Sequence, residues 1–111
     1  MTIVVNQDSD ISVFALSGRL DAVSAPQLED RIGLWFEQPG IKLIFNLEAL
    51  DYISSAGLRV FLTCAKKMKT RDGKFCMAGL RPQVKEVFTI SGFITLIPEY
   101  ATVGAAKDAL R

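Results

Sequence analysis

The chain has 111 residues, half of them hydrophobic and 23% charged, which suits one compact domain spanning residues 1–111. Its 13 basic and 12 acidic residues give a formal net charge of +1, so the composition argues against binding to nucleic acid or to an anionic membrane surface. No apolar run approaches the roughly 20 residues that a membrane-spanning helix needs, and the N-terminus lacks the basic and apolar regions of a signal peptide. We therefore expect a cytoplasmic protein without direct membrane insertion.

The residues that commonly perform catalysis or bind metal are scarce in this sequence. It contains no histidine, no Gly-x-Ser-x-Gly frame and no Walker-type phosphate loop. Asp21, Glu48 and Asp51 could act as bases, but carboxylates in turns more often cap helices or stay solvated. Cys64 and Cys76 do not form a close pair and are predicted to be buried hydrophobic residues, with a disulfide between them as the alternative. We expect neither an enzyme nor a protein with a bound metal or cofactor.

The N-terminal third of the chain predicts a β-hairpin followed by a helix. Thr2–Asn6 and Ile11–Ser17 are rich in strand-forming residues and are separated by a polar turn. After a loop over Gly18–Val23, Ser24 and Gln27 have the spacing of a capping box and predict a helix start. Four apolar residues at i, i+4, i+7 and i+8 then form one stripe of this helix, namely Leu28, Ile32, Trp35 and Phe36. A Pro-Gly pair ends the helix.

The centre of the chain predicts a buried strand, a polar turn and a long helix. Apart from Lys42, Ile41–Asn46 is nearly continuous in apolar residues, as expected for a central strand covered by helices. The helix is predicted over about Ser55–Thr70. Its apolar side would carry Leu58, Phe61, Leu62 and Ala65. Its outer side would carry Arg59, Lys66, Lys67 and Lys69, which form either a solvated face or a surface for partner contact.

The C-terminal third predicts further alternation of strands and helices. Phe75–Ala78 has the pattern of a strand, and a short helix follows Pro82 until Ser91 and Gly92 stop it. A last strand is predicted at Thr95–Ile97, and Pro98 would open a final helix. Two strands followed by alternating helices and strands indicate βαβ units. The predicted fold class is therefore α/β, a mixed sheet of four or five strands with about four helices packed on it.

Ser54 and Ser55 stand where the turn after the central strand meets the next helix. The small residues Ala56 and Gly57 follow them, so the first helical turn would be open and its free N–H groups reachable from solvent. A phosphate placed there would meet amide donors and the positive end of the helix dipole. Either serine could instead serve only as the N-cap of the helix, since serine is among the preferred caps.

Four separated segments of the chain carry a family pattern. They are SGRLD at Ser17–Asp21, NLEAL at Asn46–Leu50, DYISSAGLRVFL at Asp51–Leu62 and ISGF at Ile90–Phe93. In this order they resemble the STAS domain, in particular the bacterial anti-sigma factor antagonists, and the resemblance covers essentially the whole chain. It implies a STAS-like fold with the serine turn at the C-terminal end of the central strand. It also implies phosphorylation of Ser55; the preceding position, often aspartate in the family, is Ser54 here, which makes Ser54 the alternative acceptor.

The resemblance implies a partner-switching protein of transcription regulation. The unphosphorylated protein would bind an anti-sigma factor with serine kinase activity and so free a sigma factor. Phosphorylation of Ser55 would release the anti-sigma factor, and a phosphatase would restore the unphosphorylated protein. The nucleotide belongs to the kinase, so no cofactor is implied. The expected partner-contact residues are Asp21, Ser24, Ser54, Ser55, Gly57, Arg59 and Arg81. The alternative is a non-catalytic docking subunit of a membrane transport assembly or another signalling assembly, in which the serine is not a switch.

Overall fold

The computed structural model describes all 111 residues as one α/β unit. Its strands are β1 (Thr2–Asp8), β2 (Ile11–Leu20), β3 (Lys42–Ile53), β4 (Lys74–Ala78) and β5 (Glu99–Tyr100). Its helices are α1 (Ala25–Phe36), α2 (Ser55–Thr70), α3 (Pro82–Ser91) and α4 (Val103–Leu110), with a single 3-10 turn, η1 (Phe93–Thr95). The predicted fold class is confirmed, with five strands and four α-helices.

One sheet contains all five strands in the order β1-β2-β3-β4-β5, which places β3 at its centre. β1 pairs with β2 in the antiparallel sense, as predicted for the hairpin, and the remaining neighbours pair in the parallel sense. Because β2, β3 and β4 run the same way, the loops that follow them lie at one edge of the sheet, where open α/β sheets usually place their sites. The serine turn follows β3 and therefore lies at this edge.

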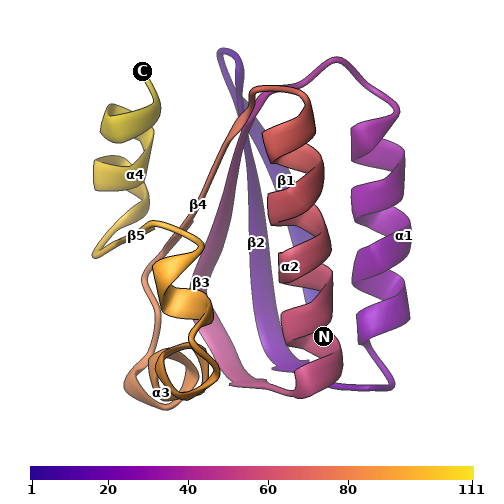
Figure 1. Cartoon of the computed structure of the whole chain (residues 1–111), viewed down its shortest axis with the longest axis vertical. Coiled ribbons are helices and arrows are strands. Elements are labelled where there is room, and N and C mark those ends of the chain that lie inside the picture. Colours follow the sequence, from indigo (N-terminus) through magenta and orange to yellow (C-terminus); the bar gives the residue numbers. More distant parts are fainter.

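The helices cover the two faces of the sheet unequally (Figure 1). α1, α2 and α3 pack on one face over a core of 22 buried residues. In this core the ring of Phe45 on the central strand meets Phe14 edge-on at 5.8 Å between centroids and lies 4.6 Å from Phe61 of α2. α4 covers part of the other face over a smaller cluster of seven buried residues. None of the four helices has both the length and the hydropathy that crossing a membrane requires.

The central strand is longer than predicted, because β3 continues through the stretch expected to be a polar turn. The register between β2 and β3 shifts twice, and each shift places one extra residue in β3. These bulges turn Leu47, Leu50 and Ile53, spaced three residues apart, toward the same buried core. β2 also extends to Leu20, so the predicted loop over Gly18–Val23 begins only after that residue.

The C-terminal segment corrects two predictions. The strand expected at Thr95–Ile97 is absent; η1 overlaps its start, and the last strand comes later, where the Gly79 N–H donates to the Tyr100 carbonyl at 3.0 Å. Pro98 does not open the final helix either. α4 begins after Thr102, whose Oγ1 accepts a hydrogen bond from a helical N–H at 3.1 Å and so caps the helix.

Two local predictions are confirmed. α3 ends where expected, because Gly92 adopts a left-handed conformation with φ of +82° that a helix cannot continue. Cys64 and Cys76 are both buried and both free, so the alternative of a disulfide between them does not hold.

The apolar side of α2 is rotated relative to the prediction. Leu58 and Phe61 are buried as expected, but Leu62 and Ala65 are only half-buried. Other residues of α2 take their place against the sheet, namely Val60, Cys64 and Met68.

Candidate functional site

The serine turn is held directly by the ends of two paired strands. Ile53, the last residue of β3, pairs with Leu20, the last residue of β2. The next backbone N–H, that of Ser54, donates to the Leu20 carbonyl at 2.9 Å. α2 begins at the following residue. The sheet therefore fixes the position of the helix start without an intervening flexible loop.

The two serines have different structural roles. Ser54 is the N-cap of α2, since its backbone is extended (φ −96°, ψ 175°) and its Oγ accepts a hydrogen bond from the Gly57 N–H at 3.4 Å. Ser55 is the first helical residue, its side chain is exposed, and its hydroxyl makes no hydrogen bond within the protein. The capping alternative left open by the sequence thus applies to Ser54, and the Ser55 hydroxyl is free.

Unpaired backbone donors lie beside the Ser55 hydroxyl. Leu58 N–H donates to the Ser54 carbonyl at 2.9 Å and Gly57 N–H to the Ser54 Oγ, whereas the N–H groups of Ser55 and Ala56 have no acceptor within the protein. The first turn of α2 also contains no acidic residue. A negative charge here would meet two amides and the helix dipole, an interaction of about 0.3–1 kcal/mol at an exposed helix start.

Gly57 has a packing role at this site. It is buried, and a Cβ on it would lie 2.7 Å from Leu20 Cγ and 2.9 Å from Ile53 Cγ1. Only glycine lets the first turn of α2 approach the two strand ends this closely. Gly57 therefore positions the start of the helix, and its predicted contact with a partner stays a prediction.

Asp21 and Ser24 lie in the loop between β2 and α1, at the same edge of the sheet. The predicted capping box is wrong, because Ser24 has helical backbone angles (φ −91°, ψ −19°) and its side chain caps no helical N–H. Instead, Asp21 Oδ1 accepts from the N–H groups of Val23 and Ser24 at 3.0 and 3.1 Å. Hydrogen bonds from Ser24 hold the pKa of Asp21 below its ordinary value. Since Asp21 directly follows Leu20, its negative charge is fixed beside the serine turn.

Arg81, in the loop after β4, is tied to the central strand. Its Nε donates to the Glu48 carbonyl at 2.8 Å, and its guanidinium forms an ion pair with Asp51. Both partners belong to β3. The ion pair brings the loop after β4 against the same strand that ends in the serine turn.

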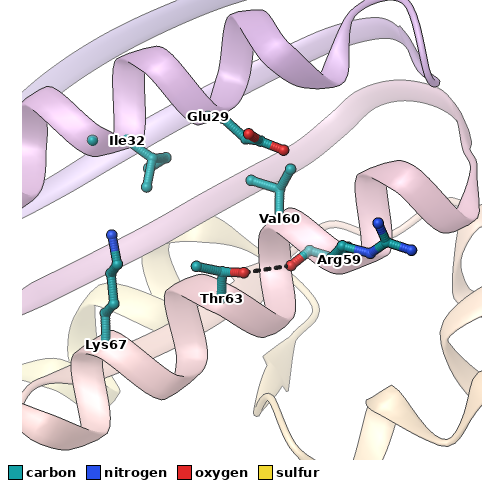
Figure 2. Close-up of a pocket in the computed structure, with 7 residues that line it drawn as sticks. Glu29, Ile32, Arg59, Val60, Thr63 and Lys67 are labelled. Atoms are coloured by element: carbon teal, nitrogen blue, oxygen red, sulfur yellow. Dashed lines mark hydrogen bonds between the residues drawn. The ribbon is translucent and has the colours of Figure 1, made fainter.

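Arg59 is an exposed cation one helical turn after Ser55. The two residues are four positions apart on α2 and so share one face of the helix. Arg59 takes part in no ion pair, and its carbonyl accepts a hydrogen bond from the Thr63 hydroxyl at 3.0 Å. With residues of α1 it lines a groove of about 370 Å³ between the two helices, shown in Figure 2. An anion on Ser55 would therefore have an uncommitted guanidinium within its reach.

Comparison with known proteins identifies the family of this chain. The model of the STAS domain matches residues 2–106. The chain belongs to the STAS domain family. It is 33% identical over 111 residues to BtrV, a candidate anti-sigma factor antagonist of Bordetella bronchiseptica, covering 100% of this chain and 96% of the relative. It is 31% identical over 94 residues to the anti-sigma-B factor antagonist of Bacillus subtilis, covering 85% of this chain and 84% of the relative. The crystal structure of an anti-sigma factor antagonist from Mycobacterium paratuberculosis matches with a TM-score of 0.91 and 28% identity, over 99% of this chain and 93% of the other.

The predicted family is thus confirmed, and this STAS domain brings most of the predicted site residues to one edge of its sheet. One contact at this edge, a cation–π pair, was not predicted from the sequence. The Arg19 guanidinium lies 4.1 Å from the centroid of the Tyr52 ring, and the two residues face each other across β2 and β3 just before the strands end. Arg19 lies within the SGRLD motif, but its contact with Tyr52 depends on the bulged register of the two strands, which the motif does not reveal.

Proposed function

We propose that this STAS domain is an anti-sigma factor antagonist that binds an anti-sigma factor with serine kinase activity and is released when Ser55 is phosphorylated. The observation that carries the proposal is the difference between the two serines. Ser54 caps α2, whereas the Ser55 hydroxyl is exposed and makes no hydrogen bond that phosphorylation would break. The relatives named as anti-sigma factor antagonists support the class of partner.

The proposed switch weakens the complex with the partner without destabilising the folded domain. Phosphorylation adds about two negative charges and three acceptor oxygens to Ser55. The free N–H groups of Ser55 and Ala56 and the guanidinium of Arg59 favour this charge in the isolated domain. A partner surface packed on Ser55 would instead face like charge and desolvation, which together cost several kcal/mol. Since about 1.4 kcal/mol changes affinity tenfold, such a penalty is enough for release.

The chain supplies a substrate hydroxyl to this reaction and no catalytic group. The Ser55 Oγ attacks the γ-phosphorus of ATP held by the kinase, the bond to the β-phosphate oxygen breaks, ADP leaves, and the hydroxyl proton passes to a base of the kinase. A phosphatase hydrolyses the phosphoserine with water and returns the hydroxyl. The domain is therefore a non-catalytic cytoplasmic binding protein in this proposal, and its output is the freed sigma factor.

Titration calorimetry against the purified anti-sigma factor from the same organism tests the proposal. Ser55→Ala should bind like wild type, whereas Ser55→Glu and the phosphorylated chain should bind at least about tenfold more weakly. Thr63→Glu is the matched control, because it places the same charge on an exposed position two turns further along α2. Equal binding by the phosphorylated and unmodified chains would overturn the switch and favour a docking subunit whose serine only starts a helix.

A further inference from the structure

The C-terminal half of α2 has an uneven distribution of charge. The helix contains four basic residues and no acidic one, although the whole chain is nearly balanced. Three of the four, Lys66, Lys67 and Lys69, lie in its last two turns; all are exposed and none forms an ion pair within the protein. This end of α2 is thus a positive surface on which no lysine has an acidic side chain as its partner.

An apolar groove lies beside these lysines, between α2 and the residue that follows η1. It consists of two adjoining hollows of about 290 and 220 Å³, which share Ala65, Lys69 and Leu96. Leu62 and Lys66 complete the first hollow, and Met68, Gly73 and Phe75 complete the second. We refer to these eight residues as the α2–η1 groove. No acidic side chain lines it, and Leu96 is 57% exposed within it.

We propose that the α2–η1 groove is a docking surface for an acidic amphipathic helix of a partner protein. Such a helix binds by laying its apolar side into a groove. The half-buried Leu62 and Ala65 and the exposed Leu96 form an apolar floor, and Lys66 and Lys69 form a rim that pairs with carboxylates. Left uncovered and edged by charge of one sign, this floor matches the apolar side and the flanking carboxylates of such a helix.

The groove is independent of the serine switch. Ser55 is the first residue of α2, and Lys66, the nearer of the two rim lysines, lies about 16 Å from it along the helix axis. This separation is about twice the Debye length at physiological ionic strength. A phosphate on Ser55 therefore leaves the affinity of the groove unchanged, and a partner held there stays bound when the surface around Ser55 is released.

A titration of the full ¹⁵N-labelled chain followed by NMR tests this surface. The probe is a synthetic helical peptide of about 14 residues, long enough at 1.5 Å per residue to span the groove, with leucines along one face and glutamates on its flanks. Shift changes should centre on Leu62, Ala65 and Leu96. Affinity should fall about tenfold or more in Leu96→Glu and in the Lys66→Glu/Lys69→Glu double variant. Ser55→Glu should bind like the unmodified chain.

Lys67→Glu is the matched control for the charge change. Lys67 lies between the two groove lysines in sequence, but its side chain reaches toward α1 (Figure 2). Its Nζ lies 5.2 Å from the centroid of the Phe36 ring. It should therefore leave the affinity for the peptide nearly unchanged. All the replaced side chains are exposed, so the variants should melt within a few degrees of wild type.

Three results would overturn the proposal. They are equal binding of a peptide with lysine in place of glutamate, shift changes centred outside the α2–η1 groove, and an equal loss of affinity in Lys67→Glu. Sedimentation of the chain alone provides a further test. A dimer that Leu96→Glu dissociates would show that a second copy of the chain occupies the groove, and the acidic partner helix would be wrong. None of these outcomes depends on phosphorylation of Ser55, so the proposal of a docking groove and the proposal of a phosphorylation switch are tested independently.

Discussion

Replacing Gly57 by alanine tests whether α2 starts as close to the sheet as the structure shows. The added Cβ would lie 2.7 Å from Leu20 Cγ and 2.9 Å from Ile53 Cγ1, well inside ordinary contact. Both neighbours are buried, and they end the two strands that hold the serine turn. The clash can be relieved only if the helix start or a strand end moves, which would also shift the Ser55 hydroxyl.

Two opposing effects decide the sign of this substitution. Alanine in place of glycine inside a helix stabilises it by about 1 kcal/mol. Forcing an extra carbon into a packed core costs about 1–3 kcal/mol. The atoms that clash are Cγ atoms near the backbone, which cannot swing aside as a flexible chain end can, so the upper part of this range applies. We expect Gly57→Ala to lower the free energy of unfolding by about 1–2 kcal/mol, and Tm by about 4–8 °C.

Gly33→Ala provides the matched control, because Gly33 is also inside a helix but a Cβ on it meets nothing within 4 Å. Only the gain in helix propensity remains, so this variant should be about 1 kcal/mol more stable than wild type, with Tm raised by about 4 °C. Urea unfolding followed by circular dichroism gives both values. If Gly57→Ala proved as stable as Gly33→Ala, the close approach of α2 to the strand ends would be refuted.

Three further outcomes are expected. Arg71→Ala should lower the free energy of unfolding, measured in urea, by about 2 kcal/mol, because the Arg71 guanidinium donates to the carbonyls of Phe36, Gln38 and Gly40 at 2.7 to 3.0 Å. Full stability in Arg71→Lys, whose single ammonium cannot reproduce this fork of donors, would contradict the reasoning. Burial raises the pKa of Cys64 to about 12 and that of Cys76 to about 11. Near pH 8 neither thiol should react with an aromatic disulfide reagent until denaturant unfolds the chain. Rapid labelling of the folded protein would contradict the burial of these thiols. A hydrogen bond from Lys107 lowers the pKa of Asp8 below its ordinary value of 3.8, so the stabilisation from this carboxylate is present above pH 3.8 and is lost as the pH falls through the lowered pKa. Asp8→Asn should therefore be less stable than wild type near pH 7 and lose less stability in acid. An identical dependence of stability on pH in the two proteins would contradict this role of Asp8.

The parts of the fold that depend on local pattern could be predicted. α2 occupies Ser55–Thr70 as expected, because the serine pair at its start and the helical period of its apolar residues are both local features of the sequence. The antiparallel hairpin and the central position of the strand after Ile41 follow equally from short apolar runs and turn residues. The serine turn at the carboxyl edge of that strand is expected from the resemblance to the STAS domain, whose sites lie where open α/β sheets usually place them.

The parts that depend on pairing between distant segments could not be predicted. The bulges that turn Leu47 and Leu50 toward one core are a property of the β2–β3 register, and no window of sequence contains both strands. A strand of two residues such as β5 has too few positions to show a period. Which serine caps α2 depends on which one takes the extended backbone, and the α2–η1 groove combines α2 with Leu96, far along the chain.

Mapping the phosphorylated residue tests the central claim most directly. The wild-type chain, Ser54→Ala and Ser55→Ala would each be incubated with ATP and the proposed kinase, the anti-sigma factor of the same organism, and the modified residue would then be located by mass spectrometry. The structure, with Ser54 as the cap and Ser55 as the free hydroxyl, leads us to expect one phosphate on Ser55, retained in Ser54→Ala and lost in Ser55→Ala. A phosphate on Ser54 would contradict this division of roles, and a stable complex without any phosphate transfer would contradict the switch itself.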